Sequence, residues 1–185
     1  GSIAALGGAL AAGLASMVGE LTAGRAKYAD VQGDMEMLCV RGKEIASELL
    51  LLIDEDTEAF NAFMAAMKLP KDTDEQKIAR KEAMQLAAKG TAEVPLKTLA
   101  LCNEAGKLAL VAIQKGNTNA VTDAASAGQF AAAAARAAGY NVRINLLSIK
   151  DETFVAEKKA AAMALLAEVE KNTEAITEAI EKALA

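Results

Sequence analysis

The segment LLIDEDTEAFNAF, residues 51–63, places three acidic residues close together in a stretch with helical periodicity. Successive residues on a helix turn by about 100°, so neighbouring acids point to different sides. A mostly apolar stripe with spacings of four and three residues passes through this segment, and it comprises Val31, Met35, Leu38, Gly42, Ile45, Leu49, Leu52, Asp56, Ala59 and Phe63. Asp54 and Glu55 lie on the opposite side of the helix, whereas Asp56 lies on the stripe itself.

Asp56 is therefore the first candidate for proton transfer. A carboxylate removed from water is costly unless it is paired, so Asp56 is either part of a structural ion pair, or a carboxylate at a wet end of a bundle, or a general acid/base. The chain contains no histidine, which excludes Ser-His-Asp and Cys-His catalysis and every histidine-ligated metal site. Proton transfer would have to use carboxylates, lysines, tyrosines or thiols.

Four asparagines form a second group of candidates. Asn117 and Asn119 lie in the loop GNTNAVTD, and Asn141 and Asn145 share one face of the following segment at helical spacing. Amides present a donor and an acceptor together, which suits a neutral heteroaromatic edge, although loop asparagines are also common turn formers. Asp123 lies in the first turn of a predicted helix, where capping is the alternative to a binding role.

The elements that must position these residues are predicted to be helical. Leu69-Pro70 ends one helix, Thr73 to Gln76 form a capping box that opens another, and Pro95 suits the first turn of a further helix. Six helical segments follow from these signals, at about 3–21, 31–67, from 73, 94–115, 124–138 and 152–184. Residues 140–151 are predicted to be helix or irregular chain, since no second strand exists to pair with them. The fold class is all-α, a single domain over 1–185 built as a bundle of long antiparallel helices.

Composition limits the partners. The formal net charge of −5 makes nucleic acid and anionic membranes unfavourable partners. The uncharged run 3–19 is predicted to be a buried helix of small residues rather than a membrane span or signal peptide.

Cys39 and Cys102 are expected to be free thiols in a reducing cytoplasm. The Ala- and Gly-rich helices 3–21 and 124–138 are too apolar to stay wet, which predicts a homodimer.

Several stretches together resemble one family. They are GSIAAL at the start, LTAGRAKY (21–28), LIDEDTEAF (52–60), KLPKDTDEQ (68–76), VPL (94–96), GNTNAVTD (116–123) and NVRINL with SIKD (141–151). In this order they resemble the formimidoyltetrahydrofolate cyclodeaminase family, which includes the cyclodeaminase half of formiminotransferase-cyclodeaminase and single-domain relatives that act as methenyltetrahydrofolate cyclohydrolases. The family pattern opens with Pro-Gly-Gly-Gly-Ser, so the resemblance implies that Gly1-Ser2 is its tail and that further residues precede position 1.

The resemblance implies an all-helical dimer that binds folate in a cleft near the subunit interface. It implies that Asp56, the second aspartate of the DxD element, is the acid/base residue. It also implies a set of substrate-binding residues, namely Ser2, Lys27, Asn117, Asp123, Asn141 and Asn145. No metal and no cofactor beyond the tetrahydrofolate substrate are expected.

The implied reaction is closure of 5-formimidoyltetrahydrofolate to 5,10-methenyltetrahydrofolate with release of ammonia. The ligand supplies both nucleophile and electrophile, so the protein has to orient them and move a proton. Methenyltetrahydrofolate cyclohydrolase, which adds water to the same carbon, is the alternative. A non-catalytic helical interaction protein, whose Ala-rich faces assemble with partners, is the second alternative.

Overall fold

The computed structural model describes residues 1–185 and contains five long α-helices, two short 3-10 segments and no strand. The helices are α1 (Ser2–Thr22), α2 (Gln32–Met67), α3 (Asp74–Lys115), α4 (Val121–Leu146) and α5 (Glu152–Leu184). The 3-10 segments η1 (Ala26–Val31) and η2 (Thr118–Ala120) precede α2 and α4. The predicted all-α class is confirmed.

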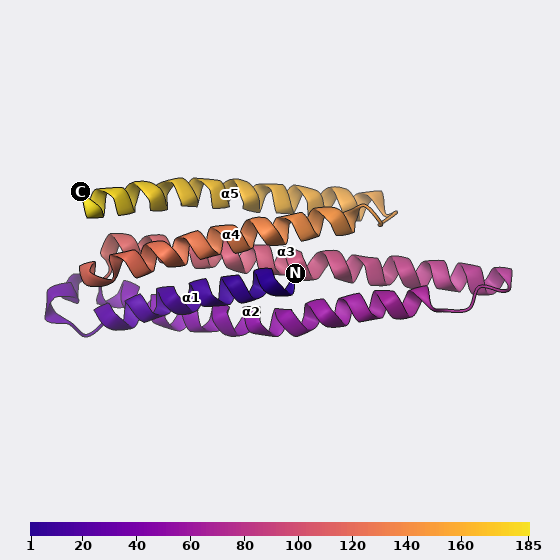
Figure 1. Ribbon diagram of the computed structural model, residues 1–185, viewed down its shortest axis with the longest axis horizontal. Coiled ribbons are helices and arrows are strands. Elements are labelled where there is room, and N and C mark those ends of the chain that lie inside the picture. The colour runs from indigo at the N-terminus through magenta and orange to yellow at the C-terminus, as the bar shows by residue number, and fades with distance from the viewer.

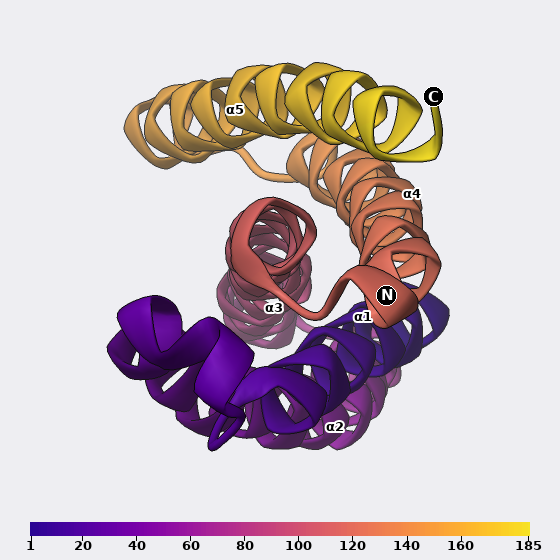
Figure 2. The ribbon, with the colours of Figure 1, turned by 90° about the vertical axis from the view of Figure 1, so that its left-hand side faces the viewer.

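The helices surround α3 in an open arc. Viewed along the bundle, α2, α1, α4 and α5 follow one another around α3, and α3 contacts all four (Figure 2). Helices α1 and α2, α1 and α4, and α4 and α5 also contact each other. The α2–α3 hairpin projects beyond the beginning of α1, which starts near the middle of the bundle (Figure 1).

The apolar stripe of α2 packs as its periodicity predicts over most of its length. Met35, Leu38, Ile45 and Leu49 are completely buried, and Leu52 is 4% exposed. Burying a side chain of this size stabilises the fold by about 1.5–3 kcal/mol relative to leaving it in water. This stripe therefore fixes which face of α2 meets α1 and α3.

Helix α3 is one helix, where the sequence signals predicted two. Asp74–Lys115 passes through Pro95 without interruption, although Thr73 and Gln76 do form the predicted capping box at its start. Proline in a helix interior removes one backbone hydrogen bond and usually bends or ends the helix. Pro95 is fully buried here, and tertiary packing on both sides holds the helix together. Pro95 is therefore an internal residue and not the first turn of a helix.

The ambiguous segment 140–151 divides in two. Helix α4 continues to Leu146, and a short turn then leads to Asp151, whose side chain accepts a hydrogen bond from the Phe154 amide as the N-cap of α5. Asn141 and Asn145 therefore lie on the last two turns of α4. Their shared helical face is confirmed.

Helix α1 is long and apolar enough to cross a membrane by composition alone, with a mean hydropathy of 1.6. In the fold it packs against α2, α3 and α4, and 56% of that apolar window is buried inside the bundle. Core helices of bundles have this composition as well. The small residues of α1, such as Ala5, Ala11 and Ala12, are completely buried and allow its neighbours to approach closely.

Candidate functional site

Asp56 of α2 meets the first residue of α1. The backbone N–H of Ser2 donates to Asp56 Oδ2 at 2.9 Å, and the Ser2 hydroxyl donates to the same oxygen at 2.8 Å. The orphan amides at a helix N-terminus favour a negative charge, so the start of α1 positions this carboxylate. The other oxygen, Oδ1, accepts no hydrogen bond from the protein, which leaves one oxygen of a fixed carboxylate free for a ligand.

Gly1 lies against the same carboxylate. A Cβ atom at Gly1 would overlap the Asp56 carboxylate group, so a residue with a side chain there would have to displace it. The Gly1 nitrogen lies 3.5 Å from Asp56 Oδ2 and donates to Asn141 Oδ1 at 3.3 Å. Three helices, α1, α2 and α4, thus meet at this point with their polar groups in contact.

Asp56 is less buried than its position on the stripe predicts. Its side chain is 26% exposed, and Phe60, one turn further along α2, is 58% exposed. Ala59 and Phe63, the next residues of the stripe, are partly buried and pack against the core, so Asp56 is a half-buried carboxylate at the edge of the core.

Asn145 lies one turn beyond Asn141 on α4 and joins that helix to α3. Its side-chain amide donates to the Thr91 carbonyl at 2.5 Å. That carbonyl would normally accept from the residue four positions later, which is Pro95 and has no N–H. The Asn145 Oδ1 atom accepts no hydrogen bond from the protein. One end of this side chain is structural, and its oxygen is available to a ligand.

A second polar cluster lies at the opposite end of α1. The Thr118 N–H donates to the Tyr28 hydroxyl oxygen at 3.1 Å, and the Thr118 and Tyr28 hydroxyls lie 3.5 Å apart. These hydrogen bonds from Thr118 lower the pKa of Tyr28 to about 8, and the neighbouring Lys27 acts in the same direction. Lys27 is exposed, makes no ion pair, and holds its Nζ 5.2 Å from the centre of the Tyr28 ring.

Asn117 and Asp123 belong to this second end of the molecule. Asn117 is 6% exposed, donates its side-chain amide to the Leu21 carbonyl at 3.1 Å and accepts from the Asn119 amide at 3.0 Å. In the single chain it therefore acts as the turn-forming amide that was the alternative interpretation. Asp123 lies in the first turn of α4, half-buried and without a side-chain capping hydrogen bond.

The seven candidate residues thus form two groups. Ser2, Asp56, Asn141 and Asn145 come together at the beginning of α1, while Lys27, Asn117 and Asp123 lie beyond its end. A helix of 21 residues is about 30 Å long, so one chain alone does not unite them. Tyr28 and Thr118 were not singled out from the sequence. The signal for Tyr28 was an ionisable phenol directly after Lys27.

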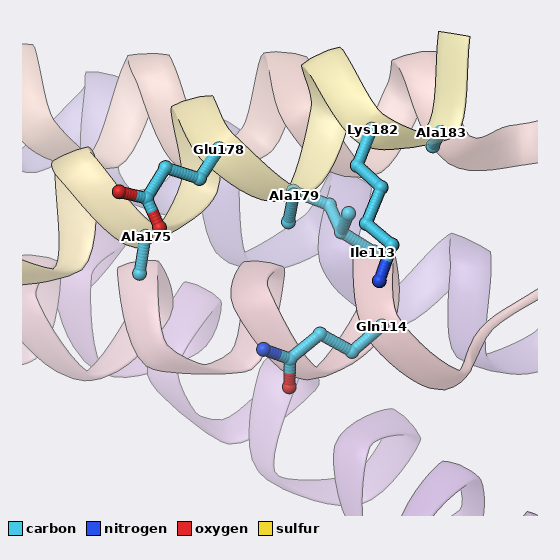
Figure 3. Close-up of a pocket in the computed structure, with 7 residues that line it drawn as sticks. All are labelled: Ile113, Gln114, Ala175, Glu178, Ala179, Lys182 and Ala183. Atoms are coloured by element: carbon cyan, nitrogen blue, oxygen red, sulfur yellow. The ribbon is translucent and has the colours of Figure 1, made fainter. Parts of the chain in front are cut away.

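The structure also has an open groove of about 510 Å³ between the end of α3 and the end of α5 (Figure 3). Its lining consists of Ile113, Gln114, Ala175, Glu178, Ala179, Lys182 and Ala183. Ile113 and Gln114 lie in the last turn of α3. None of the candidate residues lines this groove.

Comparison with known proteins agrees with the geometry. The family model described as formiminotransferase-cyclodeaminase matches residues 1–164. Methenyltetrahydrofolate cyclohydrolase from Methylorubrum extorquens is 38% identical over 180 residues, which cover 97% of this chain and 86% of that protein. Formimidoyltransferase-cyclodeaminase from Gallus gallus is 31% identical over 182 residues, and the match spans 98% of this chain but only 34% of that longer protein.

A solved structure has the same fold. The crystal structure of formiminotetrahydrofolate cyclodeaminase from Thermotoga maritima matches with a TM-score of 0.88 and 26% identity, over 100% of this chain and 88% of that one. The sequence motifs, the helical arrangement and the matches over nearly the whole chain agree with one another. This chain belongs to the formiminotransferase-cyclodeaminase family of folate one-carbon enzymes.

Proposed function

We propose that this chain is a methenyltetrahydrofolate cyclohydrolase in which Asp56 is the general acid/base. The observation that carries the proposal is the asymmetry of the Asp56 carboxylate. Ser2 donates two hydrogen bonds to Oδ2, while Oδ1 has no protein partner. A carboxylate held in one orientation with one open oxygen is suited to exchanging a proton with a bound molecule.

The proposed reaction needs one group that accepts and returns a proton. Water adds to the cationic methenyl carbon of 5,10-methenyltetrahydrofolate, and Asp56 Oδ1 takes the proton that the water loses. The bond from this carbon to N5 then breaks, Asp56 returns its proton to N5, and the hydroxyl proton goes to solvent. The products are 10-formyltetrahydrofolate and one proton. No metal and no further cofactor take part in the proposal.

Hydrolysis takes precedence over deamination because the Methylorubrum cyclohydrolase is similar to this chain over nearly the full length of both proteins. Formimidoyltetrahydrofolate cyclodeaminase is the second candidate, and the likeness to the Thermotoga cyclodeaminase supports it. In that reaction N10 attacks the protonated formimidoyl carbon, Asp56 carries the N10 proton to the amine, and ammonia leaves. Both reactions occur at one carbon, so one site is able to serve both.

We further propose that the protein is a homodimer that pairs through the outer face of α1 and α4. This α1/α4 face carries eight large apolar side chains that are 37–81% exposed, namely Ile3, Leu6, Leu10, Met17, Phe130, Tyr140, Ile144 and Leu147. No charged residue occurs in residues 3–19 of α1. An exposed apolar surface of this kind is typical of a subunit interface.

Two free thiols, Cys39 and Cys102, suit the proposed cytoplasmic location.

An absorbance assay tests the function directly, because 5,10-methenyltetrahydrofolate absorbs strongly in the near ultraviolet and its precursor and hydrolysis product do not. A cyclohydrolase makes this absorbance fall when the methenyl compound is added. A cyclodeaminase makes it rise when 5-formimidoyltetrahydrofolate is added. Absence of both changes beyond the uncatalysed rate, with folded protein, would leave the non-catalytic interaction protein as the remaining reading.

A further inference from the structure

Gln85 of α3 holds the connection between α4 and α5 with both ends of its side-chain amide. Its Nε2 donates to the Ser148 carbonyl at 3.0 Å, and its Oε1 accepts from the Lys150 N–H at 2.7 Å. Between these two contacts Ile149 is only 8% exposed and belongs to the hydrophobic core. Two hydrogen bonds to the backbone and one buried side chain therefore fix the connection to α3.

Ser148 joins this attachment to the last turn of α4. Its N–H and its hydroxyl both donate to the main-chain carbonyl of Asn145, at 3.3 and 3.0 Å. The side chain of Asn145 in turn donates to the Thr91 carbonyl of α3 at 2.5 Å. Asn145 is thus tied to α3 at two points, directly through its side-chain amide and indirectly through Ser148 and Gln85.

The position of Asn145 makes the second attachment necessary. Helix α4 ends at Leu146, so the Asn145 carbonyl is one of the last carbonyls of the helix, which have no partner within it. Helix ends open more readily than helix interiors. The contact with Thr91 holds only the side-chain nitrogen, whereas Ser148 and Gln85 hold the backbone that carries it. Together they fix where the free Oδ1 of Asn145 lies.

Lys89 secures the same connection by a separate contact. It lies one turn after Gln85 on α3, and its Nζ pairs with Asp151 Oδ2 at 2.6 Å. Asp151 accepts from the Phe154 amide as the N-cap of α5, so this ion pair belongs to the start of α5. It reaches neither Ser148 nor Asn145, which makes Lys89 a comparison for Gln85.

We propose that Gln85 is a positioning residue of the candidate site, which holds Ser148 and the last turn of α4 so that Asn145 presents its free Oδ1 to the bound substrate. The inference rests on the proposed folate chemistry. Gln85 acts through Ser148 and Asn145 and not by touching the substrate. Substrate binding should therefore depend on Gln85, while proton transfer at Asp56 should not.

The first test changes the Gln85 amide. Gln85→Met keeps the length of the side chain and removes both hydrogen bonds. We expect the KM for 5,10-methenyltetrahydrofolate to rise about three- to tenfold, as weakening of one hydrogen bond does, while kcat stays within about twofold. Gln85→Glu still accepts from Lys150 but turns an oxygen towards the Ser148 carbonyl, so its KM should rise at least as much. Ser148→Ala, which removes only the hydroxyl of an exposed residue, should raise KM by a smaller factor.

Two variants on the same helix are the controls. Lys89→Met removes the ion pair with Asp151 from the same connection. Gln114→Met changes an exposed glutamine in the last turn of α3. Both should leave KM nearly unchanged, whatever they do to the melting temperature, because neither residue is joined to Asn145.

A double-mutant cycle tests the path through Asn145. If Gln85 acts through this residue, Gln85→Met should raise KM in the unsubstituted protein but not in the Asn145→Ala protein. An equal rise in both backgrounds would overturn the positioning role.

Two further results would also overturn it while the unsubstituted protein is active. One is an unchanged KM in folded Gln85→Met protein, and the other is a rise of the same size in Lys89→Met. Inactivity of the unsubstituted protein towards both folates is a different result, since it overturns the proposed function and, with it, the role of Gln85 at that site.

Discussion

The side-chain amide of Asn145 donates to the backbone carbonyl of Thr91, the oxygen that Pro95 leaves without its helical partner. This contact connects two sequence features that looked unrelated, a proline in α3 and an asparagine on α4. Because Asn145 satisfies the carbonyl, α3 continues through Pro95 in a buried environment where an unpaired carbonyl would be costly.

Asn145→Ala should therefore lower the stability of the fold. Removal of the amide leaves the Thr91 carbonyl without a partner, which costs about 1–3 kcal/mol. Pro95→Ala restores an N–H that is able to reach this carbonyl, so the cost of Asn145→Ala should shrink in the Pro95→Ala background. Urea unfolding of the four proteins of this double-mutant cycle measures the coupling. Strict additivity would show that the two residues do not share the carbonyl.

Asp56→Asn should abolish most turnover while the fold survives. Asparagine keeps a side-chain oxygen that accepts from the Ser2 amide, but it does not exchange a proton. We expect kcat to fall by about 100-fold or more, the usual effect of losing a general acid/base. Asp54→Asn is the matched control, because Asp54 is exposed on the other side of α2 and should leave turnover nearly unchanged. A folded Asp56→Asn protein with normal kcat would make Asp56 a structural acid.

Gly1→Ala should damage the site without changing any titratable group. The added Cβ overlaps the Asp56 carboxylate, so Asp56 has to leave the position in which Ser2 holds it. Turnover in the absorbance assay should fall sharply, while circular dichroism and thermal melting stay close to normal. Gly33→Ala, at an α2 position where a Cβ has open space, is the control. Equal activity of the two variants would show that the carboxylate position is unimportant.

Leu10→Glu should dissociate the proposed dimer. Leu10 is 58% exposed on the α1/α4 face, and a glutamate there would bury a charge against an apolar partner surface. Val40→Glu is a closely matched control, since Val40 is 59% exposed on α2, outside this face. Light scattering at micromolar concentration should give a monomer only for Leu10→Glu.

Tyr28 should titrate at a lower pH than an ordinary phenol. Hydrogen bonds from Thr118 stabilise the phenolate and lower the pKa of Tyr28 to about 8, from an ordinary value of 10.0. Because the folded-state pKa is the lower one, this interaction stabilises the fold fully above pH 10 and no longer does so once the pH falls below about 8. Phenolate absorbance should rise near pH 8 and should lose this step in Tyr28→Phe. Thr118→Val, which removes the hydroxyl, should move the step to higher pH.

The sequence signals for helices predicted the fold well where periodicity is strong. The stripe from Met35 to Leu52, the capping box at Thr73 and the start of α5 after Asp151 all lie where their local chemistry places them. Pro95 was misinterpreted because its effect depends on the hydrogen bond between Asn145 and the Thr91 carbonyl, two residues 54 positions apart in the sequence. Local signals do not contain such a contact.

The candidate site was predictable only in part, because some of its contacts also join residues that are far apart in the sequence. Periodicity identified Asp56 as the acid on the apolar stripe of its helix. The structure pairs its carboxylate with Ser2, which lies far away in the sequence. Its degree of burial depends on how the neighbouring helices pack around α2, which the periodicity of α2 does not report. Lys27 and Asp56 likewise lie far apart because the single helix α1 lies between them.

Helix α5 has a separate consequence for the dynamics of the molecule. It packs mainly against α3 and α4, and only three of its 33 residues, Ala162, Val169 and Ile176, are buried. Ile176 fits against Gly128 of α4, where a Cβ would lie 2.7 Å from its Cδ1 atom. Because so few of its residues are buried, we expect α5 to open as a separate cooperative unit before the rest of the bundle. Its backbone amides should exchange with deuterated solvent well before those of α1, whose Ala5, Ala11 and Ala12 are completely buried in the bundle.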